Sequence, residues 1–150
     1  MSKLKPYLYP VTFLIAVLSM AGSLYFSEVL HFAPCVLCWY QRITMYPLVA
    51  IALVAMWRKD EKAYGYVLPF AVIGTLIALY HNVLYYAVNW GLRPDWVGPC
   101  QAGISCTTSY VSYLGFITIP FMSLVAHVVI VAMMLIAWKL DKKPASTPAV

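Results

Sequence analysis

Residues 116–138 read FITIPFMSLVAHVVIVAMMLIAW, an apolar run without a single charged side chain. A helix of about 20 such residues is long enough to cross the hydrocarbon core of a membrane. Three similar runs precede it, at Val11–Phe26, Ile43–Trp57 and Tyr66–Val88. Because a chain crossing lipid must satisfy its backbone hydrogen bonds internally, each run is expected to be helical. The sequence therefore predicts an all-α membrane protein, a four-helix transmembrane bundle.

The composition also indicates a membrane protein. Of the 150 residues, 63% are hydrophobic and 10% are charged, whereas about a quarter of the residues in a soluble domain are charged. We expect one four-span domain over residues 1–140 and a disordered cytoplasmic tail over residues 141–150. A signal peptide cleaved near Ala21 is the alternative for the first run, but the apolar residues continue through Phe26.

Basic residues predict the orientation of the bundle, because lysine and arginine in short loops stay mainly in the cytoplasm. Eight of the ten basic residues lie before the first run, between the second and third, or after the fourth. They are Lys3, Lys5, Arg58, Lys59, Lys62, Lys139, Lys142 and Lys143. We therefore expect both termini in the cytoplasm and the other two loops outside it. The net charge of +5 follows from this topology and indicates no nucleic-acid partner.

All four cysteines lie in the two outer loops, Cys35 and Cys38 in the first and Cys100 and Cys106 in the second. Four cysteines allow three connectivities, and the short separations favour Cys35 with Cys38 and Cys100 with Cys106 as disulfides in an oxidising compartment. Purely structural disulfides in a small membrane scaffold are one interpretation. A Cys-x-x-Cys bridge, however, closes too short a loop to add much stability and is typical of thiol exchange.

The residues after the first pair suggest an oxidant site. Cys38 is expected in the first turn of the second helix, where free N–H groups and the helix dipole stabilise a thiolate. Arg42 lies one turn further on the same face, placed to hold a carbonyl oxygen of a lipid-soluble oxidant, and Gln41 can add a hydrogen bond. Interfacial anchoring is the alternative for Arg42.

Two further features have competing interpretations. His81 lies near the outer end of the third run, where a buried polar side chain is often functional, although a histidine bonded to a backbone carbonyl is an equal alternative. Four thiolates could also hold zinc. The wide spacing from Cys100 to Cys106 and the oxidising compartment argue against zinc, so the sequence predicts no metal site.

Residues 35–42, CVLCWYQR, resemble the first-loop signature of the DsbB family of disulfide bond formation proteins. The order of the four runs, the second outer cysteine pair and the Tyr-Leu-Gly sequence at 113–115 are similar to that family too, so the resemblance covers nearly all of the chain except the tail. The short interval between Cys100 and Cys106 is most like the BdbC branch. Vitamin K epoxide reductase-like enzymes, another alternative, carry the Cys-x-x-Cys after the loop pair rather than before it.

The resemblance implies a thiol:quinone oxidoreductase of the bacterial inner or plasma membrane. Such an enzyme reoxidises an exported thioredoxin-like thiol oxidase, DsbA-like or BdbD-like, and passes two electrons through a quinone, menaquinone or ubiquinone, to the respiratory chain. Matched position by position, Cys38 meets the quinone, Arg42 belongs to the quinone site, and His81 falls where the family carries a nearby histidine.

The resemblance also implies an order of thiol exchange. Cys100 corresponds to the cysteine that the partner attacks, and Cys106 corresponds to its resolving companion. Cys106 would then bridge transiently to Cys35. Electrons are therefore expected to pass from the second outer loop to the first.

Overall fold

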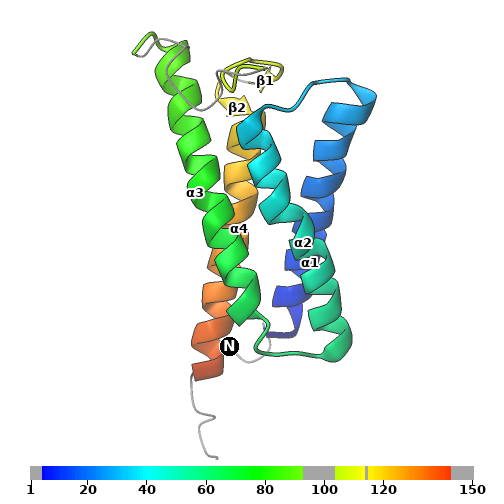
Figure 1. Ribbon diagram of the computed structural model, residues 1–150. Helices are drawn as coiled ribbons and strands as arrows, with labels where there is room; N and C mark the ends of the chain where they lie inside the picture. The colour runs from blue at the N-terminus through cyan, green and yellow to red at the C-terminus, as the bar shows by residue number, and fades with distance from the viewer. Residues whose placement is uncertain (1–4, 93–103, 114, 143–150) are drawn as a thin grey trace, which may run out of the picture.

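The computed structural model describes residues 5–92, 104–113 and 115–142 (Figure 1). The helices are α1 (Lys5–Leu24), α2 (Val36–Arg58), α3 (Tyr64–Asn89) and α4 (Ile119–Lys142). A π-helix, η2 (Tyr25–Val29), extends α1, and the antiparallel pair β1 (Ser112–Tyr113) and β2 (Ile117–Thr118) precedes α4. Four helices, with η2 counted as part of the first, are long and apolar enough to span a membrane. The predicted all-α, four-span fold is confirmed.

The helix boundaries differ from the ends of the apolar runs. Helix α2 begins at Val36, before the run that starts at Ile43, so Cys38 lies in its first turn as expected. Helix α4 begins at Ile119, and Phe116 lies in the turn between the strands. Helix α4 also continues through Lys142, so the first two residues of the predicted tail are helical. The rest of that tail, residues 143–150, lies outside the described residues.

The helices run up and down in sequence order, and each packs mainly on two neighbours. Helices α1 and α3 both contact α2 and α4. The described start of α1, the α2–α3 connection and the described end of α4 lie at one end of the bundle, and η2 and the strands lie at the other (Figure 1). We call the first end the inner end and the second the outer end, following the predicted orientation.

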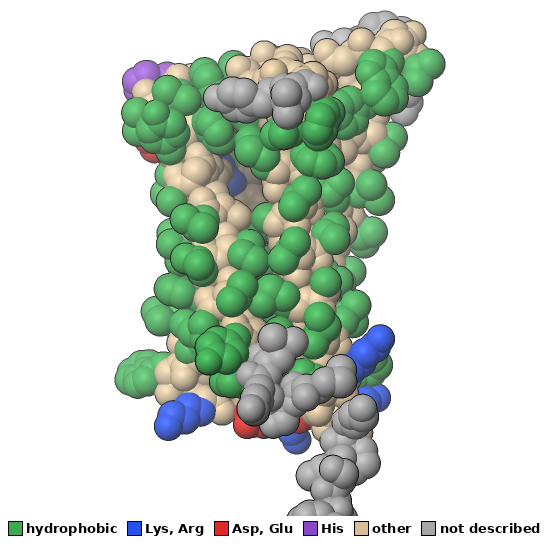
Figure 2. Space-filling model, turned by 180° about the vertical axis from the view of Figure 1, so that it is seen from behind, with side chains coloured by type: hydrophobic (Ala, Val, Ile, Leu, Met, Phe, Trp, Pro, Cys, Tyr) green, Lys and Arg blue, Asp and Glu red, His purple; other side chains and the backbone are tan. Residues whose placement is uncertain are grey.

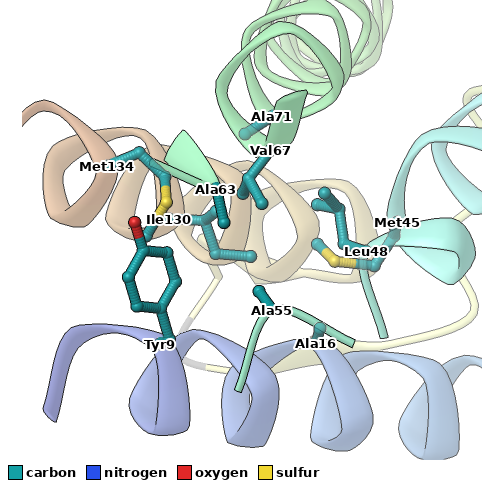
Figure 3. Packing of buried hydrophobic residues seen from close by; sticks show 10 residues of the cluster. All are labelled: Tyr9, Ala16, Met45, Leu48, Ala55, Ala63, Val67, Ala71, Ile130 and Met134. Atoms are coloured by element: carbon teal, nitrogen blue, oxygen red, sulfur yellow. The ribbon is translucent and has the colours of Figure 1, made fainter. Parts of the chain in front are cut away.

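The inner half of the bundle is closed by an apolar core (Figure 3). Leu48, Val67, Ile130 and Met134 are fully buried there, at 0% exposure. Several alanines lie among these larger side chains, and small residues of this kind allow membrane helices to approach closely. This core therefore aligns the four helices and positions the outer ends from which the cysteines emerge.

A buried histidine joins three helices in the middle of the bundle. Nδ1 of His127 lies 2.9 Å from the Ser123 carbonyl oxygen, and Nε2 lies 3.2 Å from Oγ1 of Thr44. Because a carbonyl oxygen only accepts, Nδ1 carries the proton. The single proton of the Thr44 hydroxyl is shared between Nε2 and the Gln41 carbonyl oxygen, which lies 2.9 Å from Oγ1. A Cβ on Gly74 would clash with the His127 ring. This contact was not predicted from the sequence, because it depends on a glycine and a histidine from different helices.

Candidate functional site

The first cysteine pair forms the N-terminus of α2. Cys35 is the N-cap residue, with an extended backbone, and its Sγ accepts the Cys38 N–H at 3.2 Å. The two Sγ atoms lie 2.6 Å apart, and both cysteines are free. The structure thus brings the predicted pair together as a dithiol, whereas the sequence favoured a disulfide as the resting form.

The helix N-terminus stabilises a thiolate on Cys35 rather than on Cys38. An N-cap side chain accepts a hydrogen bond from the N–H two or three residues ahead, and here that donor is Cys38 itself. The Cys38 thiol and His81 also bond to the Cys35 sulfur; the Cys38 thiol has the largest effect, and together they lower the pKa of Cys35 from 9.0 to about 5 although burial opposes them. The expectation that Cys38 receives the helix N–H groups is therefore wrong, because Cys35 caps the helix.

His81 connects the two cysteine loops. Its Nε2 lies 2.9 Å from the Cys106 carbonyl oxygen and 3.9 Å from the Cys35 Sγ, and its Nδ1 lies 2.9 Å from the Gln41 amide nitrogen. The carbonyl requires a proton on Nε2, so Nδ1 accepts from the Gln41 amide. His81 is only 1% exposed. His81 therefore makes a hydrogen bond to a backbone carbonyl, as one of the two interpretations of the sequence predicted. It also contacts Cys35 of the first cysteine pair.

The second cysteine pair is described in part. Cys106 is buried and disulfide-bonded. It belongs to one apolar cluster with Cys35, Leu37 and Leu84. Cys100, its expected partner, lies outside the described residues. The structure therefore packs one cysteine of each predicted pair, Cys35 and Cys106, into the same cluster.

A cavity of about 340 Å³ lies beside the dithiol at the outer end. Mainly apolar side chains line it, and Cys38, Gln41, Arg42 and His81 contribute polar groups to its wall. Figure 2 shows a hollow in the side of the bundle below the outer end, with a basic side chain inside it and hydrophobic side chains around it. The cavity is therefore open on the side that membrane lipid would surround.

Arg42 is held at the cavity wall by helix α1. Its Nε donates to Oγ of Ser23 at 2.9 Å, and its Nη2 donates to the Ser23 carbonyl oxygen at 3.0 Å. The guanidinium also lies 5.2 Å from the centroid of the Trp39 ring. Tyr46 donates to the same Ser23 hydroxyl at 3.3 Å. These contacts turn Arg42 toward α1 and the cavity, which interfacial anchoring alone does not require.

Three aromatic rings close the outer side of the cavity. Phe32 of the first loop stacks on Phe26 of η2 with centroids 6.1 Å apart and on Tyr110 of the second loop at 4.8 Å. All three residues line the cavity. Neither these rings nor Ser23 could be predicted from the sequence, because no spacing pattern connects residues from separate segments.

The fold and site together define a class of protein. It is a four-helix membrane protein with a Cys-x-x-Cys dithiol at a helix N-terminus, a second loop cysteine packed against that dithiol, and a cavity beside the dithiol at the outer end of the bundle. Thiol exchange between two loops is the chemistry that this arrangement can support.

Comparison with known proteins identifies the family. The model described as Disulfide bond formation protein DsbB matches residues 5–137. The chain is 42% identical to disulfide bond formation protein C of Bacillus subtilis (strain 168) over 123 residues, which cover 82% of this chain and 86% of that protein. It is 41% identical to the probable disulfide formation protein C of Halalkalibacterium halodurans over 119 residues, 79% of this chain and 84% of that protein. No solved structure matches.

The chain belongs to the DsbB family and is a disulfide-forming membrane protein. The resemblance to the BdbC branch is confirmed by these relatives, which are disulfide formation proteins C.

Proposed function

We propose that this chain is a thiol:quinone oxidoreductase that reoxidises an exported thioredoxin-like thiol oxidase. The observation that supports this function most is the arrangement of the dithiol. Cys38 lines a mainly apolar cavity together with Arg42, while Cys35 packs against Cys106. One face of the dithiol thus meets a site for a lipid-soluble oxidant, and the other meets the second cysteine loop.

The residues of the cavity fit a quinone. Small-molecule sites are mostly apolar, with a few polar groups that orient the ligand. The Arg42 guanidinium has five N–H donors, of which Ser23 engages two, so donors remain for a quinone oxygen. Gln41 and His81 lie on the same wall. A quinone bound there, menaquinone or ubiquinone, supplies an acceptor for the two electrons of the dithiol.

The cysteines of the chain carry the exchange. A thiolate of the partner attacks Cys100 and expels Cys106, and the Cys106 thiolate then attacks Cys35 of the Cys35–Cys38 disulfide and releases Cys38 at the cavity. The second thiol of the partner then closes the partner's own disulfide and frees Cys100, and Cys100 attacks Cys106 and releases Cys35, which leaves the Cys35–Cys38 dithiol. Each step breaks one disulfide as it forms another, so no electrons leave the protein until this dithiol is oxidised. Cys35 is the better-stabilised thiolate, and it is the sulfur that closes the Cys35–Cys38 bond.

His81 supports the contact between the loops. Its N–H donates to the Cys106 backbone carbonyl while the ring lies beside the Cys35 sulfur. The second loop is thereby held against the first pair. We further propose, from the distribution of basic residues, that the protein spans the bacterial inner or plasma membrane with its cysteine loops outside the cytoplasm and both termini inside it.

Reconstitution tests the function. Vesicles containing the protein and menaquinone or ubiquinone receive a reduced thioredoxin-like partner, and both partner thiols and reduced quinone are measured. We expect one quinone reduced for each partner disulfide formed. A membrane scaffold with structural disulfides would consume no thiols and reduce no quinone.

Trapping tests the order of exchange. A partner with a single cysteine attacks Cys100 of the Cys100–Cys106 disulfide and expels Cys106, and because it lacks a second thiol to release itself, it should remain covalently attached to Cys100. Peptide mapping locates the adduct. A cross-link to Cys35 or Cys38 would reverse the proposed order.

Topology is tested separately in intact cells. After reduction, a membrane-impermeant thiol reagent should label cysteines of both outer loops. Labelling only after lysis would place the loops in the cytoplasm and contradict the proposed orientation.

A further inference from the structure

The dithiol and His81 together form a set of metal ligands that the sequence did not predict. The Sγ atoms of Cys35 and Cys38 and a ring nitrogen of His81 lie within 4.8 Å of one another. Over residues 5–92, 104–113 and 115–142, no other group of three or more potential ligands lies this close. We propose that the reduced protein binds one thiophilic divalent cation, Zn²⁺ or its analogue Cd²⁺, through these three residues, and that the bound ion blocks disulfide formation.

The ligand chemistry suits such an ion. Two cysteine thiolates and one histidine, with a fourth position open, form one of the recurring ligand sets for zinc. Zn–S bonds of about 2.3 Å and Zn–N bonds of about 2.0 Å at tetrahedral angles separate a sulfur from a nitrogen by about 3.5 Å. The Cys35 Sγ and His81 Nε2 are already 3.9 Å apart. This pair can therefore hold an ion with little movement of the backbone.

The two sulfurs must move apart. They lie 2.6 Å from each other, whereas two sulfur ligands of one tetrahedral zinc ion are separated by about 3.8 Å. Cys35 is 5% exposed and fixed as the helix cap, but Cys38 is only partly buried and lines the cavity. Rotation of the Cys38 side chain toward the cavity provides the separation, and the cavity gives access for the ion and room for a fourth ligand.

Gln41 can hydrogen-bond to His81 both with and without a bound metal ion. A metal-bound histidine usually donates its other ring N–H to a nearby acceptor, and the Gln41 amide already lies 2.9 Å from Nδ1. When Nε2 gives its proton up to bind the ion, a reversal of the Gln41 amide presents its oxygen to a proton on Nδ1. The Nε2 contact with the Cys106 carbonyl is then lost. Metal binding and the contact between the loops are therefore alternatives.

The charges balance on binding. Well above pH 5, where Cys35 is already a thiolate, a divalent cation displaces one proton, from the Cys38 thiol. The complex of the ion with two thiolates and a neutral imidazole has no net charge. A neutral complex is far less costly to bury than an isolated charge. The same sulfurs cannot form a disulfide while both bind the ion, so the reduced protein is held inactive. The site does not depend on the proposed quinone function.

A cadmium titration without quinone or partner tests this site. The background is the full chain with Cys100→Ser and Cys106→Ser, reduced under anaerobic conditions so that only Cys35 and Cys38 supply thiols. Cd²⁺ is followed by the ultraviolet charge-transfer absorbance of cadmium thiolates, and released protons are measured in parallel. We expect one ion and, at neutral pH, one proton per chain, because Cys35 is already a thiolate there, and no binding after oxidation to the disulfide or in Cys38→Ser.

Single substitutions separate this site from a simple dithiol chelate. Gln41→Leu should weaken binding about 10–100-fold, Gln41→Glu should preserve it, and His81→Ala should weaken it more than Gln41→Leu does. His31→Ala is the matched control, because this exposed histidine lies in the first outer loop near Cys35. This variant should bind Cd²⁺ as tightly as the background protein. X-ray absorption of the bound ion should show two sulfur ligands and one nitrogen ligand.

Three results would overturn the proposal. They are one ion shared by two chains, unchanged affinity in His81→Ala, and cadmium binding that survives Cys38→Ser. Helix content measured by circular dichroism accompanies each titration, so that only folded variants are compared. Failure of quinone reduction in the reconstituted system would leave the cadmium result unaffected, and the two proposals can therefore fail independently.

Discussion

The two halves of the bundle are built from the same four helices but bury different chemistry. In the inner half, Leu48, Ile130 and Met134 fill a closed apolar core. In the outer half, Gln41 and His81 are buried beside a cavity of about 340 Å³. A packed apolar core resists change, whereas a partly open polar end can exchange ligands and electrons. Stability and chemistry are therefore expected to respond to substitutions in different halves.

The largest effect is expected from exchanging one atom in the outer half. Cys38→Ser removes the sulfur at the cavity, so quinone reduction should fall below detection while the unfolding transition stays unchanged. Met134→Ala in the inner half should do the reverse, lowering the free energy of unfolding by about 2–5 kcal/mol through the cavity it creates and leaving turnover in the folded protein intact. Turnover and denaturant unfolding should be measured for both variants. An equal loss of stability in both would contradict the proposed division between a stabilising inner half and a chemically active outer half.

Arg42 tests the polar wall of the cavity. A hydrogen bond to a charged group contributes about 1.5–3 kcal/mol, so Arg42→Ala should raise the KM for quinone about 10–100-fold with little change in thiol exchange. Arg42→Lys should restore activity only in part, because lysine lacks the planar set of donors. Steady-state kinetics with quinone and partner varied separately measure this. An unchanged quinone KM in Arg42→Ala would assign the residue to interfacial anchoring.

The middle of the bundle separates the halves and tolerates little change at Gly74. Gly74→Ala brings a methyl group into the His127 ring, and overpacking of this kind costs about 1–3 kcal/mol. Gly65→Ala on the same helix is the control, since a Cβ there meets nothing within 4 Å. That substitution should be neutral or add about 0.5–1 kcal/mol through helix propensity. Comparable destabilisation by both would mean that the His127 contact is not specific.

The last prediction concerns pH. In the folded dithiol form the pKa of Cys35 is lowered to about 5 from 9.0, chiefly by the Cys38 hydrogen bond and also by His81. Ionisation of Cys35 therefore stabilises the folded protein fully above about pH 9, and this contribution is lost as the pH falls through about 5. Ultraviolet thiolate absorbance of reduced protein should rise with a midpoint near pH 5, and His81→Ala should move the midpoint upward. A midpoint near 9 would contradict the capping geometry.

Sequence reasoning succeeded where one local pattern carries the information. Apolar runs predicted the four spans, and a spacing of four residues placed Cys38 and Arg42 on the same wall. The role of the helix N-terminus was assigned to the wrong sulfur, because capping depends on the side-chain conformation of Cys35. The Ser23 contact with Arg42 joins segments 19 residues apart. Neither its presence nor its geometry follows from the spacing of residues in one segment.

The central claim is that the outer half passes electrons from the second cysteine loop to the dithiol at the cavity. The most direct test is disulfide mapping of Cys38→Ser combined with Cys100→Ser, which leaves Cys35 and Cys106 as the two remaining cysteines. Because these residues share one buried cluster beside His81, oxidation should join them within a single chain, and a peptide linking the two loops should be recovered. Two free thiols after oxidation, or a disulfide formed only between chains, would contradict the account.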